Sequence, residues 1–171
     1  EMQRSLVGSE MCIRDRSIPL LREMRKNPRV IGVKNSSMPT QDIQMWKDEG
    51  GESFVVMNGP DEQFISGLAM GATGGIGGTY AVMPELFLKV YSLYQSGEMG
   101  AAAQVQNEIC RIIYKMCEAH GNLYAVMKAI LKKYGVECGS VRKPLPALID
   151  SDAAIVGEAA AMIDAAIAKF C

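Results

Sequence analysis

The chain has 171 residues, of which 49% are hydrophobic and 22% charged, and its formal net charge at neutral pH is −1. This composition is typical of a globular protein, and the length is typical of one domain. The 18 basic and 19 acidic residues leave no excess positive charge for phosphates, which argues against a nucleic-acid partner. No apolar run approaches the roughly 20 residues of a membrane-spanning helix, so a membrane protein is not expected either.

Cysteine and histidine usage argues against metal and disulfide chemistry. The five cysteines are scattered without a Cys-x-x-Cys pair, and His120 is the single histidine. A zinc site or a disulfide framework needs a denser and more regular set of these residues. The sequence therefore predicts no metal site, and reduced thiols in a cytoplasmic protein.

Residues 1–16 differ from the rest of the chain because they show no sustained period of 3.6 or 2. The segment Leu6 to Asp15, LVGSEMCIRD, resembles the translation of a transposon-type sequencing adapter. We expect residues 1–16 to be an adapter-derived or disordered tail. The natural sequence would then begin near Arg16 or Ser17, at a point within a longer protein.

From Ser17 to Gly97 the pattern alternates between short helices and short strands. After a first helix capped by Ser17, strands are predicted over residues 29–33, 53–57 and 72–76, and helices over 40–50, 61–70 and 84–96. Three successive βα units imply parallel strands with right-handed crossovers. The expected fold class is therefore α/β for residues 17–97.

After Gly97 the chain is predicted to be helical only. Apolar residues step at three and four from Ala102 to Met116, and further helices are expected to begin after Asn122 and Ser151 as caps. The proline-containing linker over residues 139–148 is expected to run extended. Residues 98–171 are thus predicted to form a helical layer appended to the βα part.

Lys34 is the first candidate for chemistry, because it closes a predicted buried strand. Catalytic groups of βα folds usually lie at the carboxyl ends of the strands. Flanking Ile31 and Val33 are expected to exclude water from the amine, which would favour the neutral form that attacks a carbonyl. The alternative is a lysine whose side chain only extends to solvent at a strand end.

Two further stretches follow the next two strands. Asn58 to Glu62, NGPDE, places two adjacent carboxylates at a helix start, where they suit a polyhydroxyl substrate but also ordinary turn and helix-start chemistry. Gly71 to Tyr80, GATGGIGGTY, fits neither the P-loop nor the dinucleotide fingerprint. Its glycines indicate either a close backbone approach to a ligand or neighbouring strand, or simply a tight turn.

Four segments together carry a family resemblance that extends from about Ser17 to the C-terminus. In chain order they read VIGVKNSS, MNGPDEQF, GATGGIGGTY and GSVRKPL. In this order and spacing they resemble the N-acetylneuraminate lyase and dihydrodipicolinate synthase family of pyruvate-dependent class I aldolases. The resemblance implies a (β/α)₈ barrel followed by a three-helix extension, of which this chain would supply the last three βα units. It also implies a cytoplasmic homotetramer.

The resemblance assigns roles to particular residues. It implies that Lys34 forms an imine with pyruvate, that Ser36 is a hydroxyl near that lysine, and that no separate cofactor is needed. By the same resemblance, further residues border the substrate: Gly59, Asp61 and Glu62 along the polyhydroxyl chain, and Ile76 and Gly77 beside the bound pyruvate. Gly78 stands where lyase-type sequences often have serine, so one hydroxyl contact would be missing.

The catalytic tyrosine and the carboxylate-binding loop of the family have no counterpart here, and the resemblance places both in an absent N-terminal half. The chain alone is therefore expected to be inactive. The leading hypothesis for the parent protein is a lyase that splits a sialic acid. The alternatives are the synthase that condenses pyruvate with a semialdehyde, a sugar-acid aldolase, and a non-catalytic keto-acid-binding or scaffold member.

Overall fold

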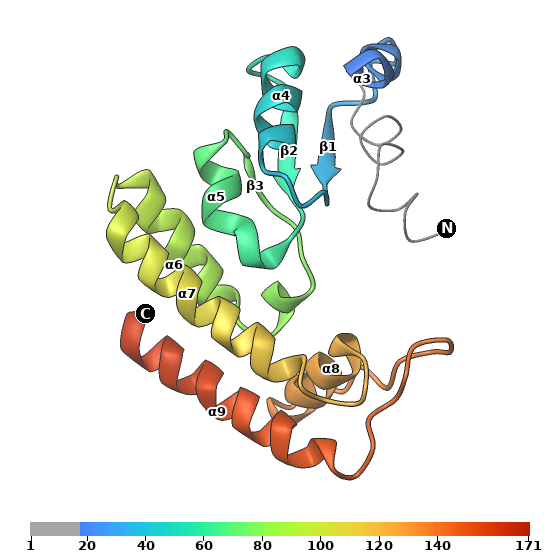
Figure 1. Cartoon of the computed structure of the whole chain (residues 1–171), viewed down its shortest axis with the longest axis vertical. Helices are drawn as coiled ribbons and strands as arrows, with labels where there is room; N and C mark the ends of the chain where they lie inside the picture. Colours follow the sequence, from blue (N-terminus) through green and yellow to red (C-terminus); the bar gives the residue numbers. More distant parts are fainter. Residues whose placement is uncertain (1–17) are drawn as a thin grey trace. The chain divides into compact units, whose positions relative to one another are not determined.

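A computed structural model describes residues 18–171, and the chain divides into two compact units. The first unit ends at Ile76, and the second runs from Gly77 to Cys171. Figure 1 shows the helices and strands of both units. The predictions for residues 1–16 and for a cap at Ser17 lie outside the described residues.

The first unit is a parallel three-stranded sheet with helices between the strands. Its sheet order is β1-β2-β3, and each strand runs parallel to its neighbour. This confirms the expected succession of βα units. In chain order the elements are α3 (Ile18–Met24), β1 (Gly32–Asn35), α4 (Gln41–Gly50), β2 (Val55–Asn58), the 3₁₀ turn η1 (Asp61–Gln63), α5 (Phe64–Ala69) and β3 (Gly74–Gly75).

The first two strands begin later in the chain than the apolar runs predicted. The run over residues 29–33 becomes β1 at Gly32–Asn35, and the run over 53–57 becomes β2 at Val55–Asn58. Pairing starts where the N–H of Val55 donates to the carbonyl of Ile31 at 3.0 Å. Because a ladder forms only where both strands are present, the turn before Val55 delays the strand beyond what hydrophobicity indicates.

One face of this sheet is the core of the first unit. Val56 lies on that face, and its register partner Val33 packs against the same cluster. The buried cluster joins α3, α4 and the sheet through Leu21, Ile43, Trp46, Phe54, Val56 and Ala72. Since side chains alternate along a strand, Lys34 and Met57 point to the opposite face.

The second unit is helical, as predicted for most of its length. Its elements are the 3₁₀ turn η2 (Thr79–Ala81) and the helices α6 (Pro84–Gln95), α7 (Met99–Met116), α8 (Leu123–Lys133) and α9 (Asp152–Phe170). Figure 1 shows α6, α7 and α9 side by side, with α8 near one end of α7. Pro84 begins α6 as predicted, since its fixed φ suits the first helical position.

The two predicted helix caps of this unit differ in outcome. The side chain of Asn122 accepts a hydrogen bond from the N–H of Tyr124 at 3.0 Å, which confirms the cap of α8. Ser151 holds the cap position of α9 but makes no capping hydrogen bond, so that prediction was wrong. The adjacent carboxylate of Asp152 accepts hydrogen bonds from segments that precede α9 rather than from the first turn of the helix.

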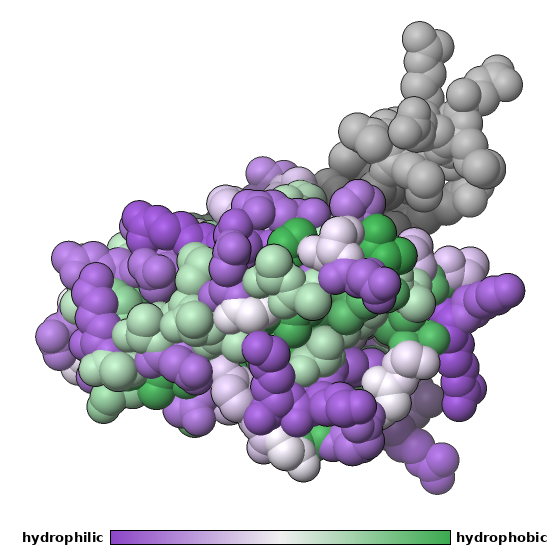
Figure 2. Space-filling view, turned by 90° about the horizontal axis from the view of Figure 1, so that it is seen from below, coloured by the Kyte–Doolittle hydropathy of each residue, from purple (hydrophilic) through white to green (hydrophobic). Residues whose placement is uncertain are grey.

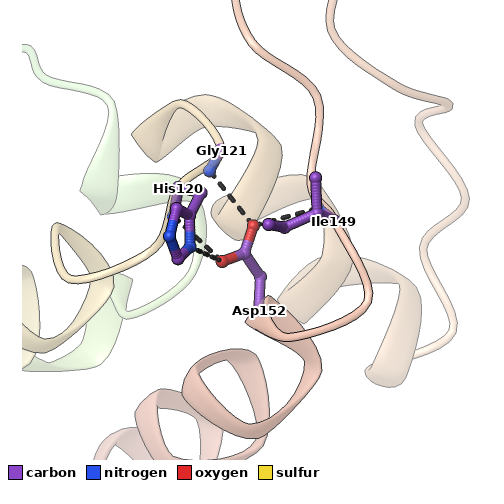
Figure 3. A network of polar contacts seen from close by, with 4 residues as sticks. All are labelled: His120, Gly121, Ile149 and Asp152. Atoms are coloured by element: carbon purple, nitrogen blue, oxygen red, sulfur yellow. Dashed lines mark hydrogen bonds and ion pairs between the residues drawn. The ribbon is translucent and has the colours of Figure 1, made fainter.

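Asp152 binds three backbone N–H groups from two segments that precede α9 (Figure 3). Its carboxylate accepts from the N–H groups of His120 at 2.9 Å, Gly121 at 3.1 Å and Ile149 at 3.0 Å, and Nδ1 of His120 lies 3.2 Å away. The N–H of Ile149, together with those of His120 and Gly121, lowers the pKa of Asp152 from 3.8 to about 2. This buried carboxylate therefore joins the turn before α8 to the end of the linker.

Figure 2 is turned by 90° from Figure 1 and shows one face of the surface, coloured by hydropathy. A band of apolar surface crosses this side between hydrophilic side chains. Outward-facing alanines of α9 are exposed, among them Ala154, Ala161, Ala165 and Ala168. Among the described residues, no helix combines the length and apolarity that crossing a membrane requires.

Candidate active site

Lys34 lies on the open face of the sheet, near the carboxyl end of β1. It is the third residue of the strand and the register partner of Met57, and its side chain is exposed. An open groove of about 540 Å³ runs along this face and is lined by Lys34, Val55, Met57 and Ile76, among others. The amine is thus presented into a groove with mostly apolar walls.

The expectation that Ile31 and Val33 exclude water from Lys34 was wrong for this chain. Ile31 precedes β1 and is 70% exposed at the groove, and Val33, which packs against the core, only contributes to the groove wall. Alternation along the strand places the side chain after Val33 on the open face, where it remains accessible. The groove, with Ile31 and Val33 among its apolar walls, thus borders Lys34 without burying it.

Ser36 and Gly59 are brought together by the loops that follow β1 and β2. The N–H of Gly59 donates to the carbonyl of Asn35 at 2.7 Å. A Cβ placed on Gly59 would lie 2.5 Å from Oγ of Ser36 and 2.6 Å from the carbonyl oxygen of Asn35. Only a residue without a side chain fits this approach, so glycine is required here for close packing.

The two carboxylates predicted at the second loop lie at the start of η1. Asp61 is its first residue and is buried, with 8% of its surface exposed, whereas the next residue, Glu62, is exposed. Pro60 before them is extended, so the chain turns into η1 directly after the Gly59 contact. The acidic pair is therefore carried by the same loop that packs against Ser36.

The glycine-rich stretch spans both units. Gly74 pairs with Met57, and Ile76 is 50% exposed and lines the groove with Lys34. Gly77 and Gly78 begin the second unit, where a Cβ on Gly78 would lie 3.0 Å from Cε1 of Tyr124. The first unit thus brings Lys34 and Ile76 to one groove and Ser36 to the loop of Gly59, Asp61 and Glu62.

Asn35 was missed as a site residue, and Asn58 was noted only as part of a turn. They are register partners at the last position of β1 and β2, and both are buried. Each is hydrogen-bonded to its own loop, Asn35 to Ser37 and Asn58 to Pro60. An asparagine within two residues of the end of each of the first two predicted strands was a signal in the sequence, but the pairing of the two residues depends on the strand register, which the sequence does not give.

The arrangement defines a class of site. An accessible amine lies near the carboxyl end of a parallel strand, and the loops beside it carry a hydroxyl group and two carboxylates. Such an amine is the nucleophile of enzymes that bind carbonyl substrates as imines. The carboxyl edge of parallel strands is also where α/β proteins bind their ligands.

Comparison with known proteins agrees with this class. The model of the dihydrodipicolinate synthetase family matches residues 14–161. The N-acetylneuraminate lyase of Mediterraneibacter gnavus is 60% identical over 149 residues, which are 86% of this chain and 47% of that protein. The chain therefore belongs to the dihydrodipicolinate synthetase family, and it spans about half the length of this relative.

Solved structures agree as well. The wild-type sialic acid aldolase of Ruminococcus gnavus superposes with a TM-score of 0.89 at 58% identity, over 91% of this chain and 52% of that one. A catalytic lysine mutant of the same aldolase superposes equally well, with a TM-score of 0.89, 58% identity and coverage of 91% and 51%. The α/β fold of this chain is therefore shared with about half of that aldolase.

Proposed function

We propose that this chain is the lysine-bearing part of an N-acetylneuraminate lyase. The observation that carries the proposal is the placement of Lys34 near the carboxyl end of β1, in the groove along the open face of the sheet and close in sequence to the packed loops of Ser36 and Gly59. The 60% identity to an N-acetylneuraminate lyase supports this substrate. The reaction would convert sialic acid into N-acetylmannosamine and pyruvate.

In the proposed reaction the neutral amine of Lys34 attacks the keto carbon of the open-chain substrate, and water leaves as an imine forms. A base removes the proton of the C4 hydroxyl, the C3–C4 bond breaks, and its electron pair moves into the iminium. N-acetylmannosamine departs as an aldehyde. The remaining enamine is protonated at carbon, and water releases pyruvate and restores the amine.

The loop of Gly59, Asp61 and Glu62 would select the substrate in this reaction. Carboxylates accept hydrogen bonds from hydroxyl groups, which a polyhydroxyl chain offers and a short semialdehyde does not. Ser36 would lie at the reacting end, and Ile76, Gly77 and Gly78 would border the pyruvate portion. No cofactor takes part, because the imine supplies the electron sink.

The proposal extends to the architecture of the whole protein. Residues 17–97 would supply the last three units of a (β/α)₈ barrel, and residues 98–171 would form its helical extension. The assembly would be a cytoplasmic homotetramer. The catalytic tyrosine and the carboxylate-binding loop would come from the other half of the barrel.

A chimera tests the proposed function. Residues 18–171 are joined to the part of the Ruminococcus gnavus aldolase that precedes its match to Ile18, and this protein is called the completed enzyme below. It is assayed on N-acetylneuraminate, and on pyruvate with aspartate semialdehyde. We expect cleavage of the sialic acid and no appreciable condensation. Faster turnover of the semialdehyde would favour the synthase, and a folded enzyme without either activity would favour a non-catalytic member.

A further inference from the structure

Two buried asparagines, Asn35 and Asn58, lie at the carboxyl ends of neighbouring strands. Asn35 and Asn58 end β1 and β2 and are register partners, so their side chains leave the same face of the sheet side by side. Asn35 is 8% exposed and Asn58 is fully buried. The pair therefore lies on the helix-covered face, opposite to the groove that holds Lys34.

Each asparagine fixes one of the two loops that carry site residues. Oδ1 of Asn35 accepts from the N–H of Ser37 at 3.2 Å and lies 2.8 Å from its Oγ, which is 2.6 Å from the carboxylate of Asp42 in the first turn of α4. Nδ2 of Asn58 donates to the carbonyl of Pro60 at 2.7 Å. The first set of bonds fixes the loop of Ser36, and the second fixes the loop that leads to Asp61.

The two amides also have complementary groups left over. Among residues 18–171, neither Nδ2 of Asn35 nor Oδ1 of Asn58 has a hydrogen-bond partner, although both atoms are buried. One is a donor and the other is an acceptor, on neighbouring strands. A buried polar group without a partner costs free energy, so these two atoms are a cost that the hydrogen bonds of the same amides to their loops offset.

Close packing leaves little freedom to the amide of Asn58. A Cβ on Gly67 of α5 would lie 2.4 Å from Oδ1 of Asn58, so helix backbone abuts this oxygen. The backbone of Asn58 is held too, because its carbonyl accepts from the N–H of Ile76 at 2.9 Å. Asn58 thus contacts three parts of the chain, which are the loop after β2, α5 and the glycine-rich stretch.

We propose that Asn35 and Asn58 act as a positioning pair for substrate selection, each through the hydrogen bonds that hold its own loop. The pair fixes the loop of Ser36 relative to the loop of Gly59 and Asp61, and so sets where hydroxyl groups of the substrate are received. This role rests on the proposed lyase function and deepens it. Neither asparagine touches the substrate, since both lie behind the sheet.

The test uses the completed enzyme and its Asn58→Ala variant. We expect the KM for N-acetylneuraminate to rise about tenfold, because small displacements of positioning loops have effects of this size or larger. Borohydride trapping of pyruvate on Lys34 should proceed at the wild-type rate, since β1 is unchanged. Asn58→Asp keeps the shape but cannot donate to Pro60, and it should raise KM in the same direction.

Val56→Ala is the matched control. Val56 and Val33 are register partners on the same face, two residues before the asparagines, and Val56 lies in the core. This variant should lower Tm and leave KM unchanged. An unchanged KM in both Asn58 variants, or a rise in KM that Val56→Ala reproduces, would overturn the positioning role.

The experiments distinguish a wrong lyase function from a wrong positioning role of Asn35 and Asn58. A wild-type completed enzyme that traps pyruvate without cleaving N-acetylneuraminate would refute the proposed substrate alone. The pair is then tested by hydrogen exchange at the N–H of Gly59, which donates to the carbonyl of Asn35. Faster exchange in Asn58→Ala than in Val56→Ala would support the pair, and equal exchange would overturn it.

Discussion

Replacing Gly59 by alanine tests whether the loops that follow β1 and β2 are as closely packed as the structure indicates. The added Cβ would lie 2.5 Å from Oγ of Ser36, 2.6 Å from the carbonyl oxygen of Asn35 and 2.8 Å from Cα of Ser36. Ordinary contacts of this kind need at least about 3.4 Å. Two of the three close atoms are backbone, so a rotation of the Ser36 side chain cannot relieve the overlap.

The size of the expected stability loss follows from the atoms that the added Cβ displaces. Overpacking costs about 1–3 kcal/mol. Separating the loops also weakens the 2.7 Å hydrogen bond from Gly59 to Asn35, which contributes about 1 kcal/mol. The completed enzyme with Gly59→Ala should therefore lose about 2–4 kcal/mol of stability. Its kcat/KM for N-acetylneuraminate should fall on the order of tenfold, because Ser36 and Asp61 separate.

Gly100→Ala is the control for this experiment. Gly100 lies in the first turn of α7, and a Cβ there would meet no atom within 4 Å. The change should leave kcat/KM unaltered and stabilise the helix by at most about 1 kcal/mol. Thermal melting and steady-state kinetics of both variants measure the difference. If the melting temperature and kcat/KM of Gly59→Ala are as little changed as those of Gly100→Ala, the two loops can separate without cost. Close packing at Gly59 would then be refuted.

In the completed enzyme Asp61→Ala should lower kcat/KM for N-acetylneuraminate by about 10–100-fold while pyruvate trapping persists, since buried acceptors discriminate strongly for hydroxyl-bearing substrates. An unchanged kcat/KM would show that Asp61 does not belong to the site. The lowered pKa of Asp152, about 2 against an ordinary 3.8, contributes stability that is present above pH 4 and is lost as the pH falls toward 2. The melting temperature should therefore fall more steeply over this range than in Asp152→Asn, and parallel curves would contradict the assignment. Deleting residues 1–16 should change stability by no more than about 0.5 kcal/mol, and a loss above about 2 kcal/mol would show that they belong to the folded protein.

Much of the fold could be predicted because the spacing of apolar residues and the turn residues are local features of the sequence. The helix α6, for example, begins at Pro84 and carries apolar residues at helical spacing. Turns that contain glycine lie between the strands. Strand bounds were less predictable, since β1 begins at Gly32 only because β2 pairs with it from there. The exposure of Lys34 and Ile31 depends on which face of the sheet the helices cover, which no local pattern contains.

The site could be predicted in part for the same reason. The motif around Lys34 and the NGPDE segment pointed to the carboxyl edge, and the structure places both there. The pairing of Asn35 with Asn58 depends on strand register and was not predictable. The role of Asp152 depends on hydrogen bonds to His120, 32 residues earlier in the chain. Such long-range contacts are set by tertiary packing.

The central claim is that Lys34 forms the imine, and one measurement tests it most directly. The completed enzyme is incubated with pyruvate, reduced with borohydride and digested for mass spectrometry. We expect one adduct per subunit on the peptide that contains Val33-Lys34-Asn35, and none in Lys34→Ala, whereas Lys128→Ala should be labelled like the wild type. An adduct on another lysine, or trapping that survives in Lys34→Ala, would contradict that claim.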